Sequence, residues 1–183
     1  MLYDVIMSGF GGQGVLLIGD LLAYVAMQEG KQVTWMPSYG VEMRGGAANC
    51  TVVISDKKVG APLSEAPAAL VAMSNPGLLK FQDRLQPGGL LVVNSSLADL
   101  QQVERSDVDL LGIPANEIAA REMGDQKNAN MIVLGAFIAK SKAVSFTETL
   151  DSLSGFLPSG RQQLAGAIAE ALERGKLYVE EGC

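Results

Sequence analysis

The feature that most constrains this chain is a glycine-rich segment between an apolar strand and an apolar helix. Residues 9–14 read Gly-Phe-Gly-Gly-Gln-Gly and satisfy the spacing G-x-G-x-x-G. The residues before them predict a strand over Tyr3–Ser8, and those after them predict a helix over Val15–Gln28. A second strand is expected over Gln32–Met36. This order is that of a β-α-β unit, which indicates an α/β fold.

The rest of the 183 residues continues the alternation of strands and helices. Four more strands are expected, over Ala47–Ile54, Ala68–Met73, Leu90–Val93 and Val108–Ile113. Five more helices are expected. The first is opened by Ser74-Asn75-Pro76 and runs through Leu85, and the second is capped by Asn116 and ends at Met123. The other three are expected over Asn128–Lys140, Thr147–Leu153 and Ser159–Arg174, with Gly175 as the stop of the last. No linker long enough to divide the chain is found, so we expect one domain over residues 1–183.

The glycine loop is a candidate anion-binding turn. Glycines permit a tight turn and close approach to the backbone, and a helix start offers unpaired N–H groups to a phosphate or another anion. The candidate cofactor-binding residues are therefore Gly9, Gly11, Gly12, Gln13 and Gly14. The alternative is that the glycines only let the helix pack closely on the strand, and the spacing alone does not separate these interpretations.

A nicotinamide dinucleotide fits this loop poorly. Its fingerprint includes an acidic residue about 20 residues on, at the end of the second strand, that holds the ribose. Here that strand ends in Val33-Thr34-Trp35-Met36-Pro37, without a carboxylate or an arginine. The lysine and hydroxyl of a nucleotide-binding P-loop are also missing, because Val15 and Leu16 follow Gly14. A nicotinamide-dependent dehydrogenase is therefore disfavoured.

The loop over Pro37–Gly46 is the second segment with chemical content. It is expected to leave the carboxyl end of a strand beside the glycine loop, where open α/β sheets bind ligands. Glu42 and Arg44 are two residues apart and share one face of an extended chain, so they can grip a partner or simply form an exposed ion pair. The candidate residues for contact with a partner or substrate are Ser38, Tyr39, Glu42, Arg44, Gly45 and Gly46.

The scarce residue types exclude several kinds of chemistry. The chain has no histidine and two cysteines, Cys50 and Cys183. A Ser-His-Asp site and an imidazole base are therefore excluded within it, and two thiolates cannot supply the four ligands of an iron–sulfur cluster. We assign no catalytic residue and no metal site. A net charge of −6 argues against nucleic acid as a partner, and the short apolar runs argue against a membrane span. No leader segment is recognised, so we expect a cytoplasmic protein.

The two loops together resemble the gamma subunit of 2-oxoacid:ferredoxin oxidoreductases, a family that includes pyruvate, 2-oxoglutarate and branched-chain enzymes. The motifs are Gly-Phe-Gly-Gly-Gln-Gly at 9–14 and Ser-Tyr-Gly-Val-Glu-Met-Arg-Gly-Gly at 38–46. Asn49–Ser55, Pro87–Gly89 and Asn128–Met131 with Leu134–Ala136 extend the likeness over nearly the whole chain. One departure is Val41, where relatives often carry proline.

The resemblance implies a Rossmann-like, three-layer α/β/α domain with a mixed, mostly parallel sheet. It also implies a part in the oxidative decarboxylation of a 2-oxoacid with coenzyme A (CoA), yielding acyl-CoA, carbon dioxide and reduced ferredoxin. Thiamine diphosphate, Mg²⁺ and iron–sulfur clusters would lie on partners, which are alpha, beta and ferredoxin-like delta subunits. This chain would bind no cofactor alone and would share the CoA or substrate cavity. The alternative is a stand-alone nucleotide- or CoA-binding module without catalysis.

Overall fold

The computed structural model describes residues 2–39, 47–59 and 65–182. These residues form one six-stranded sheet in the order β2-β3-β1-β4-β5-β6. The strands are β1 (Leu2–Phe10), β2 (Gln32–Tyr39), β3 (Ala47–Ser55), β4 (Ala69–Ala72), β5 (Leu90–Asn94) and β6 (Asp109–Ile113). From β1 to β6 the neighbouring strands pair in parallel, whereas β3 is antiparallel to both β1 and β2. The expected mixed, mostly parallel sheet is confirmed.

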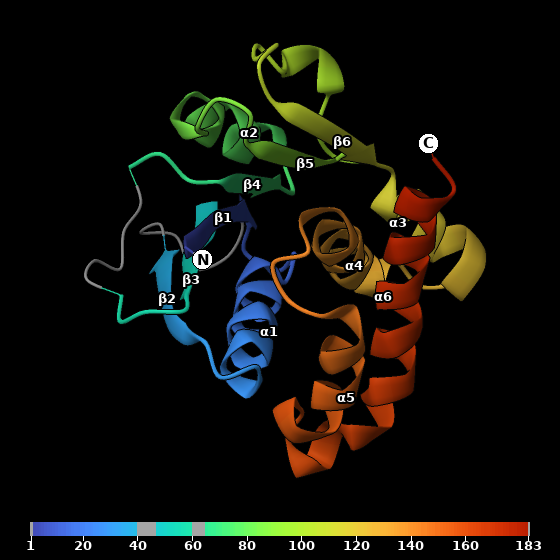
Figure 1. Ribbon diagram of the computed structural model, residues 1–183. Coiled ribbons are helices and arrows are strands. Elements are labelled where there is room, and N and C mark those ends of the chain that lie inside the picture. Colours follow the sequence, from blue (N-terminus) through green and yellow to red (C-terminus); the bar gives the residue numbers. More distant parts are fainter. Residues whose placement is uncertain (1, 40–46, 60–64, 183) are drawn as a thin grey trace.

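Helices cover both faces of the sheet, as Figure 1 shows. One face carries α2 (Asn75–Phe81), and the other carries α1 (Val15–Gln28), α4 (Ala129–Ser141), α5 (Phe146–Phe156) and α6 (Ala165–Glu180), with the short α3 (Ala115–Ile118) at their side. Neighbouring residues of a strand point to opposite faces, and accordingly Val5 and Met7 belong to the larger core under α1 and α4, while Ile6 joins the smaller core under α2. The expected three-layer α/β/α architecture is confirmed.

The first β-α-β unit differs from the sequence prediction in how its strands pair and in where its second strand ends. β1 and β2 run in the same direction but do not pair, because β3 lies between them and is antiparallel to each. β2 also extends through Tyr39, so Pro37, Ser38 and Tyr39 belong to a strand rather than to the predicted loop. Proline lacks the N–H that a ladder needs, but β2 ends the strand order and an edge strand tolerates it. The rest of the loop, residues 40–46, lies outside the described residues.

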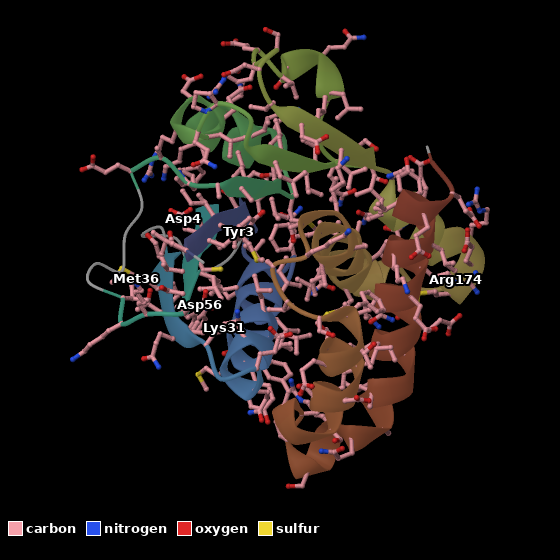
Figure 2. The ribbon with its side chains drawn as sticks, in the orientation of Figure 1. Tyr3, Asp4, Lys31, Met36, Asp56 and Arg174 are labelled. Carbon is pink, nitrogen blue, oxygen red and sulfur yellow. The ribbon has the colours of Figure 1, made fainter. Side chains whose placement is uncertain are left out.

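An ion pair joins the two ends of the β2–β3 hairpin at the edge where β1 and β2 begin. The Lys31 ammonium lies 2.7 Å from a carboxylate oxygen of Asp56, just beyond the pair Gln32–Ser55 that closes the ladder. Figure 2 shows the two side chains close together beside α1. The hydrogen bond from Lys31 is the main reason that the pKa of Asp56 falls to about 2.

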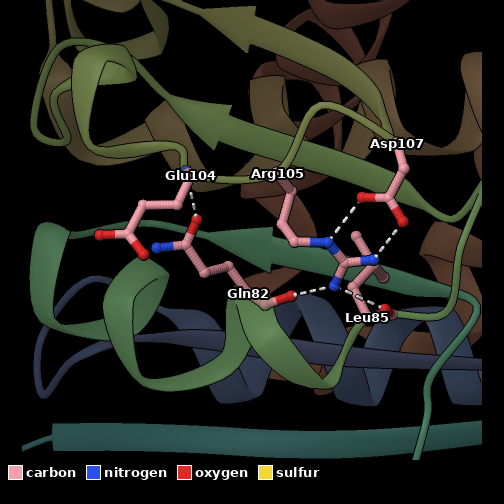
Figure 3. A network of polar contacts seen from close by, with 5 residues as sticks. All are labelled: Gln82, Leu85, Glu104, Arg105 and Asp107. Atoms are coloured by element: carbon pink, nitrogen blue, oxygen red, sulfur yellow. Dashed lines mark hydrogen bonds and ion pairs between the residues drawn. The ribbon is translucent and has the colours of Figure 1, made fainter.

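A polar network fastens the connection between β5 and β6 to the end of α2 (Figure 3). The Arg105 guanidinium donates to the carbonyls of Gln82 and Leu85, at 3.0 and 2.8 Å, and to both carboxylate oxygens of Asp107. The Gln82 side chain in turn accepts the Glu104 N–H at 3.0 Å. The carbonyls of Gln82 and Leu85, at the two ends of the 3₁₀ turn that follows α2, thus both accept from one guanidinium. The same contact lowers the pKa of Asp107.

The helices α4 and α6 cross with their backbones in direct contact. A Cβ atom added at Gly135 would collide with the carbonyl oxygen of Leu172, and one added at Gly175 would collide with that of Ile132. Gly175 is buried and lies inside α6, which continues to Glu180, so the prediction that it ends the helix is wrong. It is a glycine because no side chain fits between the two helices.

Two other helix boundaries also differ from the sequence prediction. Asn116 lies inside α3 rather than before it, and its side-chain oxygen accepts a hydrogen bond from Asn94 at 2.8 Å. The last predicted helix begins as a 3₁₀ segment over Ser159–Leu164 and becomes α-helical at Ala165. Among the described residues, no helix is long and apolar enough to cross a bilayer.

Gly175→Ala tests the helix crossing. The new methyl group meets main-chain atoms that cannot rotate away, so we expect the free energy of unfolding to fall by about 1–3 kcal/mol. The matched control is Gly166→Ala in the same helix, where an added Cβ meets nothing within 4 Å. There the stability should stay the same or rise, since alanine restricts the unfolded chain. Urea unfolding of both variants measures the difference, and equal effects would contradict the crossing.

Asp56→Asn tests the hairpin ion pair. A carboxyl whose pKa is lowered on folding stabilises the native state above its unfolded pKa of about 3.9 and loses that effect as the pH falls through its folded pKa. The wild type should therefore be more stable than Asp56→Asn at neutral pH, and the gap should close between about pH 4 and pH 2. Urea midpoints at a series of pH values measure it. Lys31→Met should remove most of the same increment, and a gap that is undiminished at pH 2 would refute the assignment.

Candidate functional site

The glycine loop lies at the carboxyl end of β1 and is fastened by the side chain of Gln13. The carboxamide oxygen of Gln13 accepts the Phe10 N–H at 2.6 Å, and its nitrogen donates to the Met73 carbonyl at 3.1 Å. The Gln13 N–H also donates to the Phe10 carbonyl at 3.1 Å, which closes the turn. Gln13 therefore ties the end of β1 to the residue that follows β4. Both ends of its carboxamide already have protein partners.

The glycines of the loop divide into two groups. A Cβ at Gly9 would collide with Gln13 and Val15, and one at Gly14 would collide with Asn130, so close packing accounts for these two. Gly14 also has a φ of 73° and precedes α1 in a left-handed conformation. By contrast, Gly11 and Gly12 are exposed, and an added Cβ at Gly12 would meet nothing within 4 Å although its φ is 99°. Packing therefore does not explain every glycine, and the exposed pair leaves its backbone open to a ligand.

Two helix N-termini meet beside this loop. α1 begins at Val15 without a capping side chain or an acidic residue in its first turn. α4 begins at Ala129 directly after the 3₁₀ turn Gln126–Asn128, which Asp125 caps. Asn130 joins them, because its amide nitrogen lies 3.4 Å from the Gly14 carbonyl oxygen while its side chain is buried. The unpaired N–H groups and the positive dipole end of α1 therefore face this region. At the start of α4, by contrast, the Asp125 carboxylate accepts the Lys127 N–H at 3.0 Å, and the Ala129 N–H donates to the Gln126 carbonyl.

A cavity of about 150 Å³ fills that region. Gly12 and Gln13 line it from one side, and Gln126, Lys127 and Asn130 line it from the other. Met73, Leu97, Asn116 and Ala129 complete the lining, which contains one cation and no carboxylate. The Lys127 ammonium is exposed and pairs with Asp125 at 3.4 Å. The arrangement suits a small anionic group, and the volume lies below the roughly 300–1,000 Å³ of complete small-molecule sites.

The described start of the second candidate loop, at Ser38 and Tyr39, lies at the same edge of the sheet as the glycine loop but not beside it. Ser38 pairs with Asn49 and Gly9 with Ala48, so β3 separates the two by two strand spacings, about 10 Å. Ser38 is exposed at the end of β2. Tyr39 is the last residue of that strand, and Glu42, Arg44, Gly45 and Gly46 lie outside the described residues.

The cysteine in the sheet is a core residue. The Cys50 thiol is fully buried, lies 3.7 Å from the Val15 carbonyl oxygen and would block a Cβ at Gly19. Burial raises the pKa of Cys50 to about 12, so the thiol stays protonated at neutral pH. In the described residues no three histidine, cysteine, aspartate or glutamate side chains gather as a metal site would require.

Sequence reasoning missed several residues of the cavity. Asn116, Gln126 and Lys127 line it, although none was a candidate site residue. A usable signal was present for Asn116, because it was predicted to cap the helix that directly follows the strand Val108–Ile113, and such a helix start lies at the carboxyl edge. Gln126 and Lys127 gave no such signal, because the helix that they precede follows another helix and only the fold brings its start to the glycine loop.

Comparisons with known proteins extend over nearly the whole chain. Residues 4–178 match the family described as pyruvate ferredoxin/flavodoxin oxidoreductase. Ketoisovalerate oxidoreductase subunit VorA of Methanothermobacter thermautotrophicus is 36% identical over 174 residues, which are 95% of this chain and 36% of that protein. 2-Oxoglutarate synthase subunit KorC of Methanothermobacter marburgensis is 34% identical over 184 residues, which are 98% of this chain and 97% of that protein.

Solved structures share the fold. The gamma subunit of a keto/oxoacid ferredoxin oxidoreductase from Geobacter sulfurreducens superposes with a TM-score of 0.81 at 28% identity, covering 98% of this chain and 99% of that one. 2-Oxoglutarate:ferredoxin oxidoreductase from Magnetococcus marinus, solved with 2-oxoglutarate, coenzyme A and succinyl-CoA bound, gives a TM-score of 0.87 at 22% identity. That match covers all of this chain and 32% of the other, and it concerns the fold alone.

The sheet is mixed and carries a glycine turn at its carboxyl edge, and residues 4–178 match the family. This chain therefore belongs to the pyruvate ferredoxin/flavodoxin oxidoreductase family. The resemblance that the two loop motifs indicated is thereby confirmed. The chain spans about a third of the length of VorA and nearly all of KorC, so the same domain occurs within a longer polypeptide and as a separate subunit.

Gln13→Ala tests the fastening of the loop. The variant leaves the Phe10 N–H and the Met73 carbonyl without their partner, so we expect a loss of about 1–3 kcal/mol of stability. Gln163→Ala is the control, because that exposed glutamine reaches only the carbonyl of Gly160, and its cost should stay below about 0.5 kcal/mol. Denaturant unfolding measures both. If Gln13→Ala were as stable as the wild type, the two hydrogen bonds of the Gln13 carboxamide would not be what fastens the loop. The carboxamide of the wild type would then be available to contact a ligand.

Proposed function

We propose that this chain is the gamma component of a thiamine diphosphate-dependent 2-oxoacid:ferredoxin oxidoreductase. The complex would decarboxylate a 2-oxoacid oxidatively with CoA and release acyl-CoA, carbon dioxide and reduced ferredoxin. The observation that carries the proposal is the end-to-end match to separate subunits of this kind, at 34% identity to KorC over 97% of its length and at 28% identity to the Geobacter gamma subunit over 99%.

The residue content of the chain supports a role without its own electron carriers. The sequence has no histidine and two cysteines, and Cys50 is buried. A cluster requires four thiolates, so iron–sulfur clusters would belong to partners, as would thiamine diphosphate and Mg²⁺. The partners we propose are alpha, beta and ferredoxin-like delta subunits, with ferredoxin as the acceptor. That this chain alone binds none of these cofactors stays a prediction.

We assign the cavity at the carboxyl edge a share in binding CoA or the substrate. Both ligands are anions, and the cavity offers the uncapped start of α1, the exposed backbone of Gly12 and the Lys127 ammonium. A volume of about 150 Å³ accommodates only an anionic group of such a molecule, so a partner subunit would provide the rest of the site. The loop over residues 38–46 begins at the same edge, and we propose that Ser38, Tyr39, Glu42, Arg44, Gly45 and Gly46 contact that partner.

Lys127→Met tests the binding of CoA at this edge. Removing one exposed ammonium costs up to about 1 kcal/mol, so the KM for CoA of the assembled complex should rise by about two- to fivefold. Lys57→Met is the control: it removes the same charge from an exposed turn where β3 ends, at the opposite edge of the sheet. Steady-state kinetics with varied CoA and varied 2-oxoacid distinguishes the two ligands. An unchanged KM for both would refute the assignment of this cavity.

Arg44→Ala tests the second loop. We expect lower turnover or weaker assembly of the complex, while circular dichroism and the melting temperature of the isolated chain stay unchanged. Arg161→Ala removes an exposed arginine from the opposite part of the helical layer, before α6, and should leave assembly intact. An Arg44→Ala complex with normal assembly and normal kinetics would contradict the proposed contact.

The alternative is a stand-alone nucleotide- or CoA-binding module without catalysis. Purification from the native source separates the two functions, because a gamma component should co-purify with thiamine- and cluster-bearing proteins. A chain that elutes alone and binds CoA without them would favour the alternative. Oxidation of a 2-oxoacid by the purified chain alone would contradict both.

A further inference from the structure

Two asparagines connect the interior of the protein to the cavity beside the glycine loop. The inner one is Asn94, the last residue of β5, which is fully buried. The outer one is Asn116 in α3, which lines the cavity. The side-chain nitrogen of Asn94 donates to the side-chain oxygen of Asn116 at 2.8 Å. Asn94 is not itself among the residues that line the cavity, so any effect that it has there passes through Asn116.

The main chain determines which way the Asn94 carboxamide points. Its oxygen accepts the N–H of Ser96 and the N–H of Ala115, both at 3.3 Å. Backbone N–H groups only donate, so they select the oxygen of Asn94 and leave its nitrogen for Asn116. Because that nitrogen is a donor, Asn116 must meet it with its oxygen. The end of Asn116 that is left for the cavity is therefore its NH₂ group.

Backbone groups orient two other carboxamides of the cavity lining in the same way. The oxygen of Gln13 accepts the Phe10 N–H, and its nitrogen gives one N–H to the Met73 carbonyl, so the second N–H of that nitrogen is left over. The nitrogen of Asn130 lies 3.4 Å from the carbonyl oxygen of Gly14. Side chains from three separate elements thus turn N–H donors, rather than oxygens, toward this part of the molecule.

A cavity with this lining accepts a group that supplies acceptors. Net charge does not decide the matter, because the Lys127 ammonium is paired with Asp125 at 3.4 Å. An ionised phosphate has acceptor oxygens alone and directs them to several sides, whereas a carboxylate directs two oxygens within one plane. Gln13, Asn116 and the uncapped start of α1 belong to different elements, so a tetrahedral phosphate can meet more of their N–H groups than a carboxylate can.

We infer that Asn94 is a positioning residue: by holding the oxygen of Asn116, it turns the Asn116 NH₂ group toward the cavity, and this donor selects a phosphate group. The role rests on the proposed function of the cavity in binding CoA or the substrate, and it names the side chains that choose the bound group. A purely structural role for Asn94 is the alternative, because its oxygen also holds the start of α3 through the Ala115 N–H.

Asn94→Asp separates the two roles. One carboxylate oxygen still accepts the N–H groups of Ser96 and Ala115, while the other replaces the nitrogen that faced Asn116. Asn116 must then donate to the new carboxylate and turns its own oxygen toward the cavity. At about pH 8, where a carboxyl held by backbone N–H groups is ionised, the dissociation constant for inorganic phosphate should rise by at least about tenfold.

The measurement is an NMR titration of the isotope-labelled full-length chain with inorganic phosphate. In the wild type the side-chain NH₂ signal of Asn116 should shift as phosphate binds, which a purely structural role of Asn94 does not predict. In Asn94→Asp that signal should differ before phosphate is added and should no longer respond to it. A parallel titration with acetate distinguishes a phosphate from a carboxylate as the preferred group.

Asn75→Asp is the matched control. Asn75 opens α2 at the same edge of the sheet, and its side-chain oxygen accepts the Asp99 N–H at 2.7 Å. The variant therefore adds the same charge at this edge to a residue that is not hydrogen-bonded to Asn116. Its dissociation constant for phosphate should stay within about twofold of the wild type.

Variants of Asn116 show whether Asn94 acts through it. Asn116→Asp keeps one oxygen for the Asn94 nitrogen but turns a second oxygen toward the cavity, so phosphate binding should weaken by at least about tenfold. Asn116→Ala removes the donor and should weaken binding by about tenfold. In the Asn116→Ala background no carboxamide is left to turn, so Asn94→Asp should change phosphate binding by less than about twofold.

Weaker phosphate binding in Asn94→Asp, with normal binding in Asn75→Asp and no further loss in the Asn116→Ala background, supports the positioning role. Normal binding in a folded Asn94→Asp chain overturns it, and so do additive losses in the double variant. A wild type that binds no phosphate, or that binds acetate more tightly, overturns it as well. Should Asn94→Asp fail to fold, wild-type phosphate affinity in both Asn116 variants would overturn it. These titrations use the chain alone, so failure to co-purify with thiamine-bearing partners is a separate result.

Discussion

The arrangement of the carboxyl edge depends on one side chain, that of Gln13. Its carboxamide holds the N–H of Phe10 and the carbonyl of Met73, and so it fixes the end of β1 against the end of β4. α1 can then begin immediately after the turn, and Asn130 brings the start of α4 to the carbonyl of Gly14. These side-chain contacts add to the backbone hydrogen bond that closes the turn and to the one from the Met73 N–H to the Ser8 carbonyl.

The loop therefore combines two uses of glycine that are often treated as alternatives. Gly9 and Gly14 are required by packing, because side chains of Gln13 and Asn130 occupy the space that a Cβ would need. Gly12 is exposed and an added Cβ there would meet nothing within 4 Å, so its φ of 99° rather than packing favours glycine. A G-x-G-x-x-G spacing by itself cannot show this division, because both uses give the same letters.

Much of the fold follows from local sequence, and the exceptions share one physical cause. α1 occupies the predicted residues, and β5 and the buried part of β3 follow from their apolar runs. The insertion of β3 between β1 and β2 could not be predicted, because strand pairing is a long-range contact that the order of elements does not encode. Gly175 was misassigned for a similar reason: locally it looks like a stop signal, but the neighbouring α4 requires it. The cavity residues Gln126 and Lys127 were missed because only tertiary structure brings the start of α4 to the glycine loop.

The crossing of α4 and α6 has a mechanical consequence. Contacts between side chains can relax by changing rotamers, whereas the contacts at Gly135 and Gly175 join main chain to main chain and have no such freedom. The two helices should therefore move together as one rigid unit. α4 alone is about 20 Å long, and its first residue, Ala129, lines the cavity beside the glycine loop. α4 therefore cannot slide along α6 without separating these main-chain contacts.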